Sequence, residues 1–289
     1  MRYGISIPNF GDWAEPRTMV GLARDAEAAG WDGFFLWDHI RFSAMPLPVQ
    51  DPWVLLAAIA TVTERITLGP MVTPLPRRRP WVVARQAVSL DHLSNGRVLL
   101  GIGIGEPVEV EYAAFGEDAE RRVRAEKLDE ALDVITGLWS GEEFSFTGSH
   151  YRLEPMRFMP RPVQQPRIPI IVAGYLPNPG PIRRAARWDG MYPLGQEGAE
   201  GWPETFAALV VDLHERHAEH AVDGMPFEIL DGGETPGSDD PAVSERNGAT
   251  WWIESLNPYR FGWDESERWP EIGPVRDRIR SGPPRPGSP

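Results

Sequence analysis

Short apolar segments alternate with amphipathic segments along almost the entire chain. A short apolar run bounded by glycine, proline or polar residues is typical of a buried strand. The pattern predicts eight such strands: Tyr3–Pro8, Gly33–Trp37, Ile66–Val72, Arg97–Ile104, Ile168–Ala173, Gly190–Leu194, Phe227–Leu230 and Ala249–Ile253. Strands separated by helices favour a parallel sheet, and eight of them suit closure into a (β/α)8 TIM barrel. Alternation alone also permits a doubly wound open sheet.

The segments between these strands carry apolar residues at helical spacing. Pro52 after Asp51 is typical of a helix start, and Gly30 is typical of a helix end. The helices predicted in this way are Glu15–Ala29, Asp51–Thr63, Pro80–Leu93, Glu117–Trp139, Pro181–Trp188, Pro203–Ala221 and Glu265–Ile279.

The rhythm breaks between the fourth and fifth strands. Residues 142–166 are rich in glycine, proline, serine and aromatic residues, which indicates an inserted hairpin or lid. No other stretch looks like a linker, so residues 1–281 are expected to form a single barrel domain. The proline-rich end of the chain, residues 282–289, is expected to be a disordered tail.

Composition narrows the class of protein. The chain has 289 residues, 42% of them hydrophobic, which is enough for one large core. Its net charge of −13 argues against a nucleic-acid or anionic-membrane partner. The absence of cysteine excludes disulfides and thiolate metal sites. The N-terminus lacks the pattern of a signal peptide, and the longest apolar run, Val54–Ala60, is too short to span a bilayer. We therefore expect a cytoplasmic protein.

Glycine recurs at every second position of the fourth strand. Gly101, Gly103 and Gly105 share one face, whereas the other face is apolar. Glycines weaken a strand, so their presence predicts that some group approaches the backbone closely. A face without side chains that ends at the Glu106 carboxylate would suit a flat ligand. The alternative is a strand that tapers inside a crowded barrel, with Glu106 merely solvated. The spacing does not match the dinucleotide fingerprint.

Polar residues and glycines follow the predicted strands. In a barrel the residues after each strand gather on one rim, where a ligand would bind. These residues are Asn9, Asp38, His39, Thr73, Glu106, Gly174, Gly195, Gly232 and Glu254.

Three other clusters have simpler interpretations. His214, His217 and His220 do not have the spacing of a zinc-binding helix, so we expect a solvated helix and no metal site. The run Arg77–Arg79 is expected to belong to a surface loop. Strand alternation predicts that one ring of the Trp251–Trp252 pair lies inside the barrel and the other outside.

The chain resembles the bacterial luciferase-like monooxygenase superfamily, in particular its F420-dependent branch. The resemblance covers nearly the whole chain to about residue 255. It rests on W-D-H at 37–39, D-P-W-x-L-L-A-A-I-A at 51–60, R-I-T-L-G at 65–69, R-R-x-P at 77–80, L-D-x-L-S-x-G-R at 90–97, G-x-G-x-G-E at 101–106, A-F-G at 114–116, A-A-R-x-D-G at 185–190 and G-A-T-W-W at 248–252.

The resemblance implies a (β/α)8 barrel with an insertion between strands four and five, and F420 or FMN at its C-terminal mouth. It implies hydride transfer between F420 and a small organic substrate, with His39 and Glu106 as catalytic residues. A non-prolyl cis peptide is expected at Met71–Val72, and the cofactor phosphate near Gly174, Gly195 and the helix around Pro181. The cofactor-binding residues that it implies are Asp38, Met71, Val72, Thr73, Gly103, Gly105, Gly174, Gly195 and Gln196. It also implies a homodimer.

One departure from the family pattern leaves the choice between F420 and FMN undecided. Related F420 enzymes have a threonine and a lysine after strand six, whereas this chain has Leu194, Gly195 and Gln196. An FMN-dependent monooxygenase is therefore the alternative enzyme, and a non-catalytic flavin-binding protein is the alternative from another class.

Overall fold

The computed structural model describes residues 1–195, 201–237, 239–265 and 268–285. Predictions that concern Gln196 and the last four residues of the tail therefore lie outside the described residues. Within the described part of the tail, Arg285 donates a hydrogen bond to the carbonyl of Gly30.

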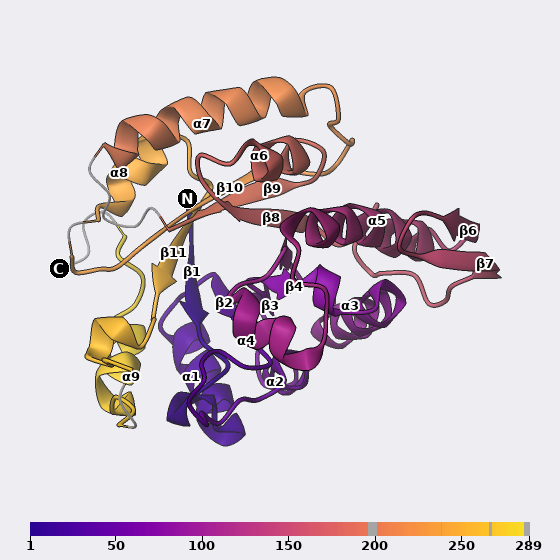
Figure 1. The fold of residues 1–289 in the computed structure, drawn as a ribbon. Coiled ribbons are helices and arrows are strands. Elements are labelled where there is room, and N and C mark those ends of the chain that lie inside the picture. Colours follow the sequence, from indigo (N-terminus) through magenta and orange to yellow (C-terminus); the bar gives the residue numbers. More distant parts are fainter. Residues whose placement is uncertain (196–200, 238, 266–267, 286–289) are drawn as a thin grey trace.

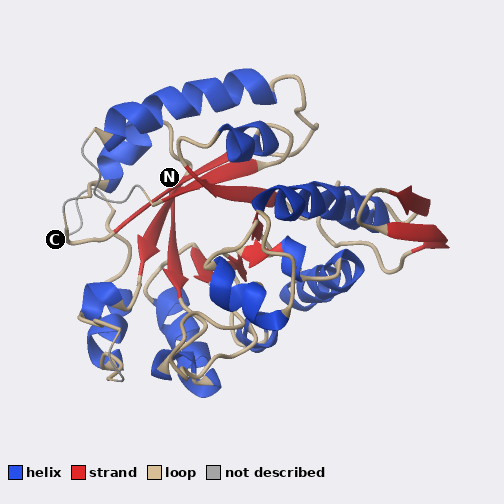
Figure 2. Cartoon of the chain, in the orientation of Figure 1, coloured by secondary structure: helices blue, strands red, loops and turns tan. Residues whose placement is uncertain are grey.

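The strands form one parallel, nearly closed barrel with helices around it (Figures 1 and 2). The strands are β1 Arg2–Ile7, β2 Gly33–Leu36, β3 Thr67–Pro70, β4 Thr73–Pro74, β5 Leu100–Gly103, β8 Ile170–Tyr175, β9 Gly190–Leu194, β10 Glu228–Gly233 and β11 Trp251–Ser255. Their order is β3-β2-β1-β11-β10-β9-β8-β5-β4. Because β3 and β4 are two pieces of the third barrel strand, the two ends of this order meet. A parallel bridge between Leu68 of β3 and Val98, two residues before β5, closes the barrel at this point.

The barrel expectation is therefore confirmed, and the open doubly wound sheet is wrong. The helices are α1 Pro16–Ala28, α2 Pro52–Ala60, α3 Pro80–Ser94, α4 Val108–Glu111, α5 Arg121–Trp139, α6 Pro179–Ala185, α7 Trp202–His217, α8 Pro241–Arg246 and α9 Ile272–Arg280. Carboxylates cap the N-termini of α1, α2, α5 and α8, because Glu15, Asp51, Glu120 and Asp240 accept hydrogen bonds from first-turn amides.

The insertion is an antiparallel hairpin of β6 Glu143–Thr147 and β7 Arg152–Arg157. It projects away from the barrel beside the end of α5 (Figure 1), so it is a hairpin and not a lid over the strands.

The closing helix begins later than predicted. It starts at Ile272, not at Glu265, where the backbone has a φ of 63° that ends regular helix. Trp269 packs its ring on Trp263 in this irregular stretch, with centroids 5.0 Å apart. Aromatic burial here overrides a sequence that is rich in helix formers.

The apolar residues divide into two layers. The barrel interior holds Phe35, Met71, Leu99, Ile171, Ala173, Tyr192, Leu230, Trp251 and Ile253. A larger core packs the outer faces of the strands against the helices and contains Trp252. The prediction for the tryptophan pair is thus confirmed, because alternate side chains of a strand point to opposite faces.

The glycine face of β5 is covered by the protein itself. A Cβ atom on Gly101 would lie 2.6 Å from the carbonyl oxygen of Pro70 and 2.7 Å from Sδ of Met71. One on Gly103 would lie 3.1 Å from Val72. Gly105 has a φ of +82° and lies beyond the strand, against Tyr112. Close approach is confirmed, but a face open to a flat ligand is wrong. The peptide bond between Met71 and Val72 is cis, as expected.

Candidate active site

His39 follows β2 and is held by its backbone and its ring. Its amide donates to Oδ1 of Asn9 (3.1 Å), and Nδ2 of Asn9 donates to the His39 carbonyl (2.8 Å). Its ring Nδ1 lies 2.9 Å from Oε1 of Glu111. Nε2 has no hydrogen-bond partner among the described residues, and the side chain is 16% exposed. Nε2 is therefore the ring atom available to a ligand.

Glu111, at the end of α4, was not predicted as a site residue. Its side chain is 1% exposed and accepts hydrogen bonds from the amides of Ile40 (3.1 Å) and Arg41 (3.3 Å). Nε of Arg77 lies 3.2 Å from its other oxygen. The sequence V-E-V-E at 108–111 presents two similar glutamates, and Glu109 is exposed. Only the docking of α4 distinguishes them.

Asp38 is buried, and its carboxylate oxygens are hydrogen-bonded to other groups of the protein. It accepts hydrogen bonds from Thr73 Oγ1 (2.7 Å), Arg78 Nη2 (2.6 Å) and Arg77 Nη2 (3.1 Å). The expectation that Arg77 and Arg78 belong to a solvated surface loop is therefore wrong. A buried carboxylate needs a cation, and these two guanidinium groups supply it. Arg77 also links Asp38 to Glu111.

Glu106 lies after β5, as predicted, with its side chain 46% exposed. Its Oε1 is 3.4 Å from Nη2 of Arg124, whose Nη1 donates to the carbonyl of Ile104 (3.1 Å). Among the described residues it makes no hydrogen bond to His39 or Glu111. The structure thus places both predicted catalytic residues after their strands but joins only His39 to a buried network.

The predicted phosphate region is partly assembled. Gly174 lies within β8, one residue before its end, and Gly195 directly follows the neighbouring strand β9. A Cβ atom on Gly174 would lie 2.4 Å from the Pro181 ring, so this glycine abuts α6. Because Pro179 and Pro181 lack amide hydrogens, the first turn of α6 offers fewer donors than expected.

The upper end of the barrel interior presents apolar surface that is not fully covered. Val72 and Leu194 are only partly buried and pack on the interior apolar column. A flavin-type ring laid over them would remove their apolar surface from water. His39 and Glu106 carry polar groups that are partly exposed at this end of the barrel.

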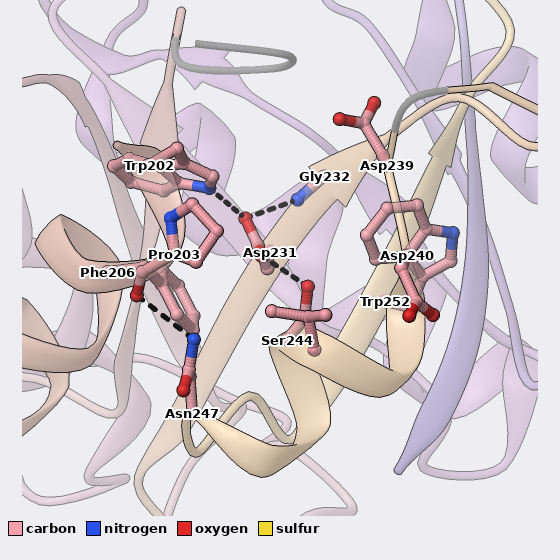
Figure 3. A pocket seen from close by; sticks show the side chains of 11 residues that line it. Trp202, Pro203, Phe206, Asp231, Gly232, Asp239, Asp240, Ser244, Asn247 and Trp252 are labelled. Carbon is pink, nitrogen blue, oxygen red and sulfur yellow. Dashed lines mark hydrogen bonds between the residues drawn. The ribbon is translucent and has the colours of Figure 1, made fainter. Parts of the chain in front are cut away.

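A separate cavity of about 160 Å³ lies outside the barrel strands, between β10 and the starts of α7 and α8 (Figure 3). The side chain of Asp231 lines this cavity. It accepts hydrogen bonds from Trp202 Nε1 (3.1 Å), Ser244 Oγ (2.6 Å) and its neighbour's amide, Gly232 (3.1 Å). Gly232 of the predicted rim lines the cavity, but none of the predicted catalytic or cofactor-binding residues does.

Burial raises the pKa of Asp231 from 3.8 to about 6, although its hydrogen bonds act to lower it. The folded protein therefore binds this proton more tightly than the unfolded chain. Its stability should decrease as pH rises from about 4 to about 6. We expect Asp231→Asn to raise the free energy of unfolding at pH 8 by about 2 kcal/mol, with the gain vanishing near pH 4. Urea denaturation at both pH values measures this.

The matched control is Asp212→Asn, because Asp212 is partly exposed in an i,i+4 pair with Arg216. It should leave stability within about 0.5 kcal/mol at both pH values. An equal gain for Asp231→Asn at pH 4 and pH 8 would contradict the assignment.

The helix with three histidines is not fully solvated. His217 is buried, with Nδ1 3.0 Å from the Ala186 carbonyl and its ring stacked on Phe227. Within the described residues no three histidine or acidic side chains are grouped to hold a metal ion. None of the described helices is long and apolar enough to cross a membrane.

Comparison with known proteins gives one family. The luciferase-like monooxygenase family matches residues 1–278. An uncharacterized protein of Mycobacterium tuberculosis is 32% identical over 284 residues, or 91% of each chain. An F420-dependent glucose-6-phosphate dehydrogenase of Gordonia bronchialis is 32% identical over 84% of this chain and 71% of its own. An F420-dependent hydroxymycolic acid dehydrogenase of M. tuberculosis is 36% identical over 54% of this chain and 44% of its own.

Solved structures show the same fold. An F420-dependent secondary alcohol dehydrogenase, in complex with an F420–acetone adduct, superposes with a TM-score of 0.68. The sequence identity is 21%, over 81% of this chain and 69% of that one. A diketocamphane monooxygenase component from Pseudomonas putida, in complex with FMN, gives a TM-score of 0.64 at 18% identity, over 81% and 67% of the two chains.

Proposed function

The chain belongs to the luciferase-like monooxygenase family, a family of F420- or flavin-dependent oxidoreductases, and from this premise we propose that it transfers a hydride between the deazaflavin F420 and a small organic substrate. The observation that supports this most is the position of His39. Its Nε2 is open at the barrel mouth while Nδ1 is tied to a buried carboxylate. The relatives named as F420-dependent support the choice of cofactor.

The cofactor ring is assigned to the apolar surface of Val72 and Leu194. Gly174 and Gly195 lie where a phosphate could approach the backbone. Asp38 supports the site indirectly, because Thr73, Arg77 and Arg78 occupy its carboxylate. Gly103 also supports the site indirectly, because its lack of a side chain allows Val72 to lie close against β5.

A bound deazaflavin supplies a carbon that gives or takes a hydride. The substrate oxygen must lose or gain a proton in the same reaction, and a positioned side chain does this best. Glu111 accepts the hydrogen on Nδ1 of His39, which leaves the basic lone pair on Nε2. Its negative charge also stabilises the imidazolium that forms. Glu106, tethered to Arg124, is assigned to orient the cofactor edge.

The charges around His39 suit this role. Asp38 and Glu111 are balanced by Arg77 and Arg78, so the network is neutral when His39 is neutral. A proton gained at Nε2 then adds one positive charge directly beside Glu111. The ring can therefore alternate between its two protonation states without leaving an unpaired buried carboxylate.

The test is a side-by-side titration with F420 and FMN, followed by the fluorescence of each cofactor. We expect F420 to bind at least about tenfold more tightly, a difference of about 1.4 kcal/mol. Leu194→Gln should weaken F420 binding, whereas the control Leu93→Gln, at an exposed position on α3, should not. Protein purified with stoichiometric FMN and unresponsive to F420 would reverse the choice of cofactor.

A homodimer is part of the proposal. Helix α2 is apolar at all nine positions, and Val54 on its outer side is 69% exposed. A helix that is apolar all round usually packs on both sides. Light scattering from the purified protein measures its mass directly.

A further inference from the structure

We propose that the substrate of this site is an uncharged, apolar secondary alcohol, or the corresponding ketone, and not a phosphorylated sugar. The inference rests on the proposed function, because it takes Nε2 of His39 as the group that meets the substrate oxygen. Two independent features of the described residues support it: the aromatic surroundings of His39, and the absence of an uncommitted cation among the groups that contact the site.

Aromatic rings surround the imidazole of His39. Phe42 lies edge-on to it with centroids 5.0 Å apart, Phe10 lies at 5.6 Å and Trp37 at 5.9 Å. Phe10 is fully buried and stacks on Phe42 at 4.2 Å, which fixes the latter ring. Phe42 and Trp37 remain partly exposed, and Ile40 beside them is 48% exposed. Phe42 and Trp37 form what we call the aromatic wall of the site, and Ile40 extends its apolar surface.

The aromatic wall continues across the end of the barrel. Phe42 lies 6.2 Å from the ring of Trp263, which contacts Trp269 at 5.0 Å. A substrate next to Nε2 therefore meets apolar surface on this side. Apolar groups gain free energy by covering such surface, whereas a phosphate would lose hydration without finding partners.

Among the described residues, the cations that contact site residues are bound to other groups of the protein. Phosphate recognition normally uses lysine or the free N–H fork of arginine. The only lysine in the sequence, Lys127, lies in α5 outside the strands. The arginines that contact site residues bind acceptors of the protein: Arg77 and Arg78 bind Asp38, Arg124 binds the Ile104 and Gly105 carbonyls and Glu106, Arg41 binds the Ser43 and Ala44 carbonyls, and Arg260 and Arg278 bind Glu254.

Carboxylates reinforce the selection. Glu106 is 46% exposed, and Glu111 lies directly behind His39. Arg77 balances Glu111, so the repulsion of a dianionic phosphate would come from Glu106, whose 3.4 Å contact with Arg124 only partly offsets its charge. A neutral alcohol experiences none.

The reaction balances with these groups alone and the deazaflavin. In the oxidation direction, the carbinol C–H bond breaks and its electron pair leaves with the hydrogen as hydride to the cofactor. The O–H proton passes to Nε2 of His39, and the C=O bond forms. The alcohol is oxidised by two electrons and the deazaflavin is reduced by two. The reverse direction reduces a ketone, and His39 returns the proton.

The experiment compares substrates on the F420-loaded protein. The probes are 4-phenylbutan-2-ol, cyclohexanol and glucose 6-phosphate, and the loss of F420 absorbance reports turnover. We expect kcat/KM for the neutral alcohols to exceed that for glucose 6-phosphate by at least about 10²-fold. Equal or faster turnover of glucose 6-phosphate would overturn the inference and leave the F420-dependent function intact.

A binding measurement provides a readout other than activity. Saturation-transfer NMR with 4-phenylbutan-2-one should show contact of the phenyl ring with the protein, with or without F420. Phe42→Ala should weaken this binding about tenfold, and Phe42→Leu, which keeps an apolar side chain, should weaken it less. The control Phe144→Ala, on the distant hairpin, should leave it unchanged.

The outcomes separate the two proposals. If F420 binds but the neutral alcohols and the ketone neither react nor bind, the substrate class is wrong and the cofactor assignment stands. If F420 does not bind, the proposed function fails, and ketone binding that depends on Phe42 still supports an apolar site. Ketone binding that Phe42→Ala leaves unchanged would rule out the aromatic wall as the determinant. Circular dichroism confirms that each variant is folded.

Discussion

Replacing His39 by alanine is expected to lower kcat by about 10²–10⁴-fold while F420 affinity changes little. The variant loses Nε2, the ring nitrogen opposite the Nδ1 atom that contacts Glu111. The backbone bonds of residue 39 to Asn9 do not depend on the side chain, so the loop should keep its position. Steady-state kinetics and a cofactor titration on the same preparation measure both effects.

Two further variants and a control test whether the loss of turnover comes from the chemistry assigned to His39. Glu111→Gln should also lower kcat, because a neutral amide stabilises the imidazolium less than a carboxylate does. Glu106→Gln should lower turnover if its charge orients the cofactor. His92→Ala, at an exposed histidine of α3, is the control and should behave as the unaltered protein. If the His39 and Glu106 variants kept near-full turnover and lost only cofactor affinity, the catalytic assignment would be wrong.

Replacing Glu254 by leucine is expected to lower the free energy of unfolding by about 3–5 kcal/mol, because it leaves two buried guanidinium groups without a counter-charge. Glu254 lies near the end of β11, one residue before Ser255, and is fully buried. Its Oε1 lies 2.7 Å from Arg260 and 3.0 Å from Arg278, and Oε2 accepts from Thr235 Oγ1 at 2.7 Å. These bonds tie the last barrel strand to α9. Denaturation followed by tryptophan fluorescence measures the loss.

The pH dependence gives a second check on Glu254. Burial alone would raise its pKa, but the charge of Arg278 and the hydrogen bonds from Thr235 and Arg260 outweigh it and hold the pKa below its usual value. The stabilisation is therefore present above the ordinary glutamate pKa of 4.5 and is lost as pH falls through the lowered folded value. The gap between the unaltered protein and Glu254→Gln should narrow in acid.

Glu126 offers a matched control for this prediction. Its side chain is 44% exposed and pairs with Arg122 one helical turn away. Glu126→Leu should leave stability nearly unchanged, because exposed ion pairs contribute little. A loss below about 1 kcal/mol for Glu254→Leu would show that the two arginines find other partners.

Glu111 illustrates what could not be predicted from the sequence. It and Glu109 occupy equivalent positions in a short V-E-V-E segment, yet one is buried against His39 and the other is exposed. Local pattern does not report which side of a one-turn helix meets another strand end. The same limit applies to Arg77 and Arg78, whose partner Asp38 lies about forty residues earlier in the chain.

The alternation of apolar and amphipathic segments by itself predicted eight parallel strands separated by helices. Strand alternation also predicted the two faces of the Trp251–Trp252 pair, because side-chain period follows from backbone geometry. The pattern left open whether the sheet closes into a barrel and whether the insertion is a hairpin or a lid. The tertiary structure alone decided what covers the glycines of β5, which carboxylates are buried and which arginines neutralise them. A strand pattern shows that one face must be packed but not by what. Buried charges choose partners by distance in space, and that distance exists only once the strands have closed.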